Sequence, residues 1–225
     1  GIQARKKPRP EAKEVWQRAY AGLAKRTADS WAVAACTLFY GKAEDAGAGA
    51  DIERHDLETS PGWKHFTAAE HAEIREAARH FLLHEPGDPC LRKGQLTDFA
   101  LHAFRALYLL RDEIERQADL KAAVRRHWVP VLLIEYYRIE AGLPTTIPMA
   151  YRLAPRQVYQ KLDQILRARF KKKGYVFELR HFKPCWNHRF TRRLLAFCEK
   201  RKLPGDFCEA VFLFLADVDR PAALE

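Results

Sequence analysis

The sequence predicts an all-α protein, and the prediction rests on the spacing of its apolar residues. In every long apolar segment these residues recur at three- or four-residue intervals, which places them on one side of a helix. Helix start signals support this: Thr67 and Glu70 form the Thr-x-x-Glu pattern of a capping box, and Pro155 suits a first helical position. Only residues 175–179 resemble a strand, and they have no obvious partner. We therefore expect antiparallel helical pairs stacked as an irregular, solenoid-like helical repeat.

The elements follow in chain order from a flexible, basic lead-in at residues 1–10. A single helical domain is expected over residues 11–220. Residues 221–225 are expected to be a tail with vector-derived residues, Gly1 the scar of a protease site, and the chain an excised fragment. The expected helix starts are near Glu11, at Asp29 or Ser30, at Thr67, at Thr97, near Trp128, at Pro155, at Asn187 and after Gly205.

Residues 41–62 interrupt this pattern with four glycines and six acidic residues. A loop of this length in a compact domain is usually functional or disordered. The excess of acids favours disorder, and we expect a long acidic loop here.

Most of the positive charge of the protein lies between Arg167 and Lys202. This stretch holds thirteen Lys or Arg and two acids, a net charge of +11, whereas the whole chain carries +10. The helix from Pro155 ends near Gly174, and a short bend at residues 183–186 leads to the helix from Asn187. The short bend predicts that the two helices pack antiparallel. Their apolar stripes turn inward, so the cations are expected to share one outer surface: Arg167, Lys171, Lys172, Arg180, Lys183, Arg189, Arg192, Arg193 and Lys200.

This basic face has three interpretations. It could bind an acidic protein surface, bind nucleic acid through several phosphates, or only keep the domain solvated. No run of about 18 apolar residues is present, so no membrane partner is expected. Five widely spaced cysteines indicate reduced thiols and a cytoplasmic location.

Motifs of catalysis are missing from the sequence. The Gly-Lys pair at residues 41–42 lacks the remainder of a Walker A loop, and no G-x-S-x-G, H-E-x-x-H or C-x-x-C pattern is present. A nuclease would need Asp163 and Glu178 around a metal, but Asp163 lies within a predicted helix. We therefore expect no enzyme activity and no cofactor.

Two sets of residues have spacings that could bind a metal. His80 and His84 lie one turn apart with Glu76 a turn before them. His181, Cys185 and His188 form the second set, with Cys198 or Cys208 as a fourth ligand. Neither matches a known zinc pattern, so structural roles are the simpler interpretation and no metal is expected. Trp186, within the basic stretch, is the one tryptophan considered as a platform for stacking bases.

Several segments, taken together, resemble the C-terminal helical-repeat region of bacterial antiviral STAND NTPases with NACHT-like ATPase cores. The resemblance spans about residues 60–220 and is carried by packing residues in segments 61–63, 74–82, 106–110, 128–133, 154–155, 174–180 and 185–186. It implies a sensor domain that binds a phage protein, with the NTPase and the effector elsewhere in the chain. It assigns no ligand-binding residue.

Overall fold

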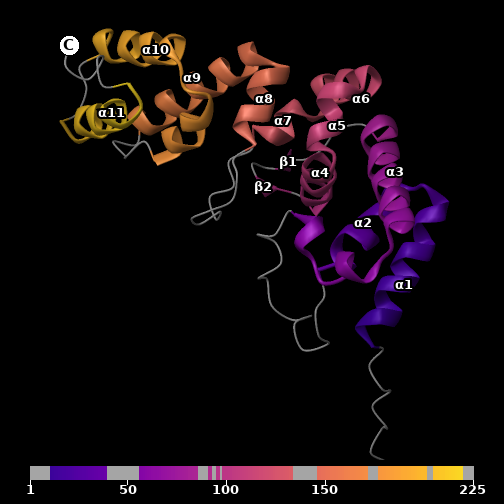
Figure 1. Ribbon diagram of the computed structural model, residues 1–225. Coiled ribbons are helices and arrows are strands. Elements are labelled where there is room, and N and C mark those ends of the chain that lie inside the picture. Colours follow the sequence, from indigo (N-terminus) through magenta and orange to yellow (C-terminus); the bar gives the residue numbers. More distant parts are fainter. Residues whose placement is uncertain are drawn as a thin grey trace, which may run out of the picture. The chain divides into compact units, whose positions relative to one another are not determined.

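A computed structural model describes residues 11–39, 56–85, 91–92, 95–96, 98–133, 146–171, 177–201 and 205–219 (Figure 1). The fold is all-α, as predicted. Its α-helices are α1 (Ala12–Gly22), α2 (Ala28–Thr37), α3 (Ala68–His84), α4 (Asp98–Leu109), α5 (Arg111–Arg116), α6 (Ala118–Ala123), α7 (Val129–Leu132), α8 (Ile147–Leu153), α9 (Pro155–Lys171), α10 (His188–Glu199) and α11 (Gly205–Val218).

Shorter elements join these helices. The 3₁₀ turns are η1 (Leu23–Lys25), η4 (Leu57–Thr59), η5 (Trp63–His65) and η7 (Phe177–Cys185), and η6 (Val124–Trp128) is a π-helical turn. Two strands of two residues each, β1 (Leu91–Arg92) and β2 (Gln95–Leu96), pair antiparallel with Leu91 opposite Leu96.

The chain divides into two compact units, Gly1–Val131 and Leu132–Glu225. That residues 11–220 form a single helical domain stays a prediction. The solenoid-like stacking of helical pairs also stays a prediction. Each unit is described below by itself.

The core of the first unit contains two tryptophans that are also hydrogen-bonded. Trp31 and Trp128 are fully buried, and their indole N–H groups donate to the carbonyls of His102 (3.0 Å) and Leu82 (2.8 Å). Buried indoles need such a partner, because an unsatisfied N–H in the core costs free energy. These bonds connect α2 to α4 and η6 to α3.

Two local expectations for this unit are corrected. Thr27, not Asp29 or Ser30, caps α2, because its hydroxyl accepts from the Ser30 N–H (3.2 Å). The helix expected from Thr97 through Ile114 breaks at Leu110, and Thr97 itself lies outside the described residues.

The end of the expected acidic loop is ordered. Within residues 41–62, positions 41–55 lie outside the described residues, whereas Leu57 is fully buried in η4. Gly62 lies against the backbone of Leu38, where a Cβ atom would approach to 2.8 Å. Only glycine fits at this contact, which holds the segment against the end of α2.

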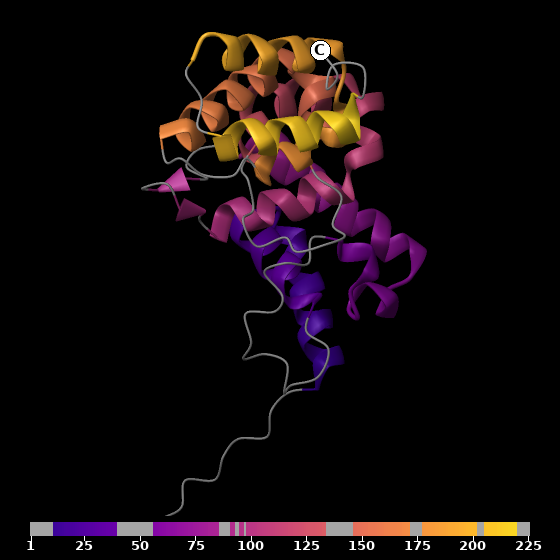
Figure 2. The ribbon, with the colours of Figure 1, turned by 90° about the vertical axis from the view of Figure 1, so that its left-hand side faces the viewer.

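The described residues of the second unit contain the helices α8, α9, α10 and α11. In Figure 2, α11 (yellow) runs alongside α10 (orange). Phe197 contacts Phe207 (ring centroids 6.1 Å apart), and at the opposite ends of the two helices Thr191 donates to Asp219 (2.6 Å). Residues early in α10 therefore meet residues late in α11, so this pair is antiparallel.

The expectation that the helices from Pro155 and Asn187 pack antiparallel is wrong. Tyr159 contacts Phe190, Asp163 pairs with Arg193, and Phe170 contacts Phe197. Across these three contacts the residue number increases along α9 and along α10 in the same order, so the two helices run parallel. The connection is longer than a bend because η7 occupies residues 177–185. Within residues 175–179, whose sequence resembles a strand, the described part is therefore 3₁₀-helical.

Candidate functional site

Asn187 sets the start of α10 and so fixes which side chains face outward. Its side-chain oxygen accepts from the N–H of Arg189 (3.0 Å), as expected of an N-cap. Phe190, Leu194 and Phe197 are then buried at helical spacing. Arg189, Arg192 and Arg193, which lie off this stripe, are exposed.

Arg189, Arg192 and Arg193 line a shallow pocket of about 350 Å³ together with Tyr159 of α9. Arg192 and Arg193 follow Arg189 by three and four residues, which places both beside it on one side of α10. Among the described residues no hydrogen bond or ion pair involves the side chain of Arg189 or Arg192. We call this feature the arginine pocket.

Arg193 differs from the other two arginines because a carboxylate of α9 holds it in place. Its Nε donates to Asp163 Oδ1 (2.9 Å) and its Nη2 to Asp163 Oδ2 (2.7 Å), a two-point ion pair. Its guanidinium carbon lies 5.6 Å from the centroid of the Tyr159 ring. Three guanidinium groups and one carboxylate leave the pocket with a net charge of +2.

Tyr159, which lines the pocket, takes part in a chain of hydroxyl contacts. Asn187 Nδ2 donates to the Tyr151 hydroxyl (3.0 Å), and the Tyr151 and Tyr159 hydroxyls are 3.1 Å apart. Burial and the Tyr151 contact raise the pKa of Tyr159, while the Arg189 charge acts in the opposite direction. Tyr159 therefore stays protonated at neutral pH and can donate a hydrogen bond.

The other residues expected on the basic face are not all gathered at the pocket. Arg167 is exposed one turn after Asp163 on α9, and Arg180 and Lys200 are exposed on η7 and after α10. Lys183 pairs with Asp217 of α11 (2.7 Å), and within the described residues no contact joins Arg180 or Lys183 to the pocket. Lys172 and the side chain of Lys171 lie outside the described residues.

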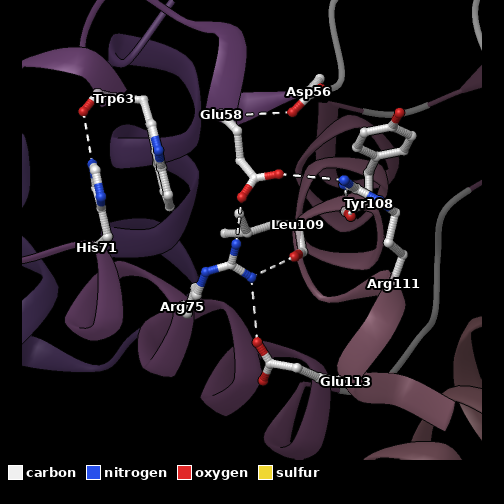
Figure 3. Close-up of polar contacts among 9 residues, drawn as sticks. All are labelled: Asp56, Glu58, Trp63, His71, Arg75, Tyr108, Leu109, Arg111 and Glu113. Atoms are coloured by element: carbon white, nitrogen blue, oxygen red, sulfur yellow. Dashed lines mark hydrogen bonds and ion pairs between the residues drawn. The ribbon is translucent and has the colours of Figure 1, made fainter. Parts of the chain in front are cut away.

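A second cluster of charges, in the first unit, has a different character (Figure 3). Arg75 pairs with both Glu58 and Glu113 and donates to the carbonyl of Leu109 (2.9 Å). Arg111 pairs with the second oxygen of Glu58 (3.3 Å) and lies over the Tyr108 ring. We call this the Glu58 cluster; its two cations and two carboxylates balance.

The residues considered for metal binding have other contacts. In the part of the chain that the structure describes, no group of three His, Cys, Asp or Glu residues could hold a metal ion. Burial raises the pKa of Cys185 and of Cys198 to about 11, so both thiols are protonated at neutral pH. His80 contacts His84 (ring centroids 4.3 Å apart), and burial followed by that neighbour lowers its pKa.

Asp163 of the nuclease pair and the tryptophan considered for base stacking have structural contacts. Asp163 is engaged with Arg193, and the side chain of Glu178 lies outside the described residues. The Trp186 ring packs on Phe190 (5.2 Å) and against Phe214 (4.7 Å), and its N–H donates to Thr191 (3.0 Å). Trp186 is therefore part of the packing between η7, α10 and α11.

The sequence analysis missed Tyr159 and Tyr151. One signal was available: Tyr159 precedes Asp163 by four residues, so both lie on the same side of α9. The pairing of Asp163 with Arg193 had no comparable signal, because it depends on the parallel packing of α9 and α10.

Within the described residues, no helix is both long and apolar enough to cross a membrane. No protein-family model, no curated protein and no solved structure matches this chain.

Proposed function

We propose that the chain is a non-catalytic recognition domain whose second unit binds an acidic partner protein through the arginine pocket and the cations around it. The observation that carries the proposal is that Arg189 and Arg192 are exposed without a partner among the described residues, beside an arginine that a carboxylate already holds. Exposed guanidinium groups add little to folding stability but are effective in recognising anionic groups.

A partner protein is favoured over nucleic acid by the local contacts. A surface for single strands combines a continuous basic groove with exposed aromatic rings. Here Trp186 is packed against Phe190 and Phe214, and Lys183 and Arg193 are paired with acids. Two unpaired arginines, Arg189 and Arg192, lie together at one pocket, which suits a localised acidic site on a protein.

The resemblance to the sensor region of bacterial antiviral STAND NTPases supports this proposal and makes a phage protein the expected partner. On this proposal the domain acts in the cytoplasm and needs no cofactor. Any NTPase or effector activity belongs to other parts of a longer protein.

The test compares two variants with the same change of charge. Arg189→Glu/Arg192→Glu reverses the pocket, and Arg125→Glu/Arg126→Glu reverses two exposed arginines of the first unit. Each protein is immobilised and incubated with nuclease-treated extract of phage-infected bacteria, and retained proteins are quantified by mass spectrometry. We expect one phage protein to be retained by the wild type and by the control pair, and at least about tenfold less by the pocket variant.

Two results would contradict the proposal. One is retention of the same phage protein by the pocket variant. The other is binding only to a random DNA duplex, with an affinity that falls steeply with salt concentration, which would indicate nucleic-acid binding.

A further inference from the structure

The charge of the arginine pocket matches a doubly charged anion. Arg193 is neutralised by Asp163, whose oxygens accept both of its bonds. Arg189 and Arg192 contribute the remaining +2, and the pocket of about 350 Å³ is large enough for a small tetrahedral group. A carboxylate carries only one charge, whereas a phosphate monoester carries close to two at neutral pH.

The tyrosine pair supplies one further donor. The Asn187 amide is oriented by its own cap, since Oδ1 accepts from the Arg189 N–H and Nδ2 therefore faces Tyr151. The two tyrosine hydroxyl groups carry two protons, and the hydrogen bond between them uses one, so the other proton is free for donation. If Tyr151 donates to Tyr159, the remaining proton belongs to Tyr159, which lines the pocket. An anion in the pocket stabilises this arrangement because it provides the missing acceptor.

We propose that the arginine pocket binds a phosphate monoester, carried as a phosphorylated side chain by the partner protein, with Arg189, Arg192 and the Tyr159 hydroxyl as donors. The inference rests on the proposed function and names the group that the pocket reads. The three donors suit three terminal phosphate oxygens, and guanidinium groups bind phosphate through paired N–H bonds. Arg193 and Asp163 hold the wall of the pocket and Asn187 orients the hydroxyl chain.

Phenyl phosphate is the probe for this site, with dimethyl phosphate as a singly charged diester of the kind found in nucleic-acid backbones. Each is titrated into the full chain, and arginine Nε–Hε signals are followed by NMR. We expect phenyl phosphate to shift the Arg189 and Arg192 signals and to bind at least about tenfold more tightly than dimethyl phosphate. Lowering the pH from about 7.5 to about 5 protonates the monoester and should weaken its binding.

Single substitutions separate the donors. Arg189→Gln and Arg192→Gln should each raise the Kd for phenyl phosphate by about tenfold or more, and Tyr159→Phe by about threefold to tenfold. Arg125→Gln/Arg126→Gln removes the same number of exposed arginines elsewhere and should leave the Kd unchanged.

Equal affinity for the diester and the monoester, or a Kd that does not respond to Arg189→Gln and Arg192→Gln, would overturn the inference. If phenyl phosphate fails to bind while Arg189→Glu/Arg192→Glu still abolishes capture of the phage protein, the inference falls and the proposed function stands. If phenyl phosphate binds as expected while that variant still captures the protein, the proposed function falls, and so does the assignment of the phosphate to the partner.

Discussion

The Glu58 cluster and the arginine pocket use the same kind of side chain for opposite purposes. In the first unit, Arg75 has two carboxylate partners and a backbone carbonyl, and Arg111 shares one of those carboxylates. In the second unit, three arginines share one carboxylate. A balanced cluster can hold segments together, whereas a cluster with surplus charge leaves donors available for a ligand. If the pocket binds as proposed, the count of nearby acids, and not the number of arginines, distinguishes the binding site from the structural one.

The largest effect is expected at Arg105, which is buried in the first unit. Its Nη1 donates to the carbonyl of Ala35 (2.9 Å), and its guanidinium lies over the Phe39 ring (4.4 Å). Arg105→Met should lower the free energy of unfolding by about 3 kcal/mol, because the buried acceptors at the end of α2 lose their donor. Urea unfolding followed by tryptophan fluorescence measures this, since four of the five tryptophans precede residue 131.

Arg105→Lys is the matched variant, because it keeps the positive charge but lacks the planar guanidinium group with its several N–H donors. It should lose less stability than Arg105→Met. A change below about 1 kcal/mol in Arg105→Met would show that this arginine does not hold α4 to α2.

A smaller loss is expected in the Glu58 cluster. Arg75 connects η4, α4 and α5 through Glu58, the Leu109 carbonyl and Glu113. Arg75→Gln should therefore cost about 2 kcal/mol, in the range measured for hydrogen bonds to charged groups. Arg79→Gln is the control, because Arg79 makes one exposed ion pair with Asp119, and its loss should cost under about 1 kcal/mol. Equal losses in the two variants would mean that the cluster contributes no more than a single surface pair.

A still smaller loss of stability is expected in the second unit when the pH is lowered. Burial, and then the charge of Arg180, lowers the pKa of His181. Below the unfolded pKa of about 6.5 the unfolded chain binds more protons at this site than the folded chain does, so stability falls as the pH decreases through 6.5 toward the folded pKa. Above 6.5 both states are neutral and His181 adds no pH dependence.

Hydrogen exchange of peptides from η7 and α10, measured from pH 7.5 down to pH 5, can detect this loss in the second unit alone. After correction for the intrinsic pH dependence of exchange, protection should decrease in the wild type and stay constant in His181→Gln. The same decrease in both proteins would assign the pH dependence to another group.

Local signals in the sequence were sufficient for much of the fold. The capping box at Thr67 and Glu70, the helix start at Pro155 and the cap at Asn187 were predictable because each depends on residues within one turn. Thr27 was missed because Asp29 and Ser30 are also good caps, and only the backbone conformation distinguishes them.

The candidate site was less predictable because its geometry depends on residues far apart in the chain. The basic stretch and the outward positions of Arg189 and Arg192 followed from helical spacing. The direction of α10 relative to α9 did not, since it depends on how η7 carries the chain back along α9. The parallel packing brings Asp163 to Arg193 and Tyr159 to Phe190, and with it determines which arginines stay unpaired.

The smallest expected effect on stability is at the pocket itself. Three guanidinium groups share one carboxylate there, so Arg189 and Arg192 repel each other and Arg193 more than they attract Asp163. Arg189→Gln/Arg192→Gln should leave the free energy of unfolding within about 0.5 kcal/mol of the wild type, with any change a gain. Because exposed charges are screened, that gain should shrink between about 0.01 M and about 1 M salt.

Arg193→Gln, which leaves Asp163 without its two-point partner, should instead lose up to about 1 kcal/mol of stability. Urea unfolding of the three proteins at both salt concentrations, with hydrogen exchange in α9 and α10 as the local readout, provides the measurement. A loss above about 1 kcal/mol in the double variant would mean that Arg189 and Arg192 are structural, as Arg75 is, and the contrast between the two clusters would disappear.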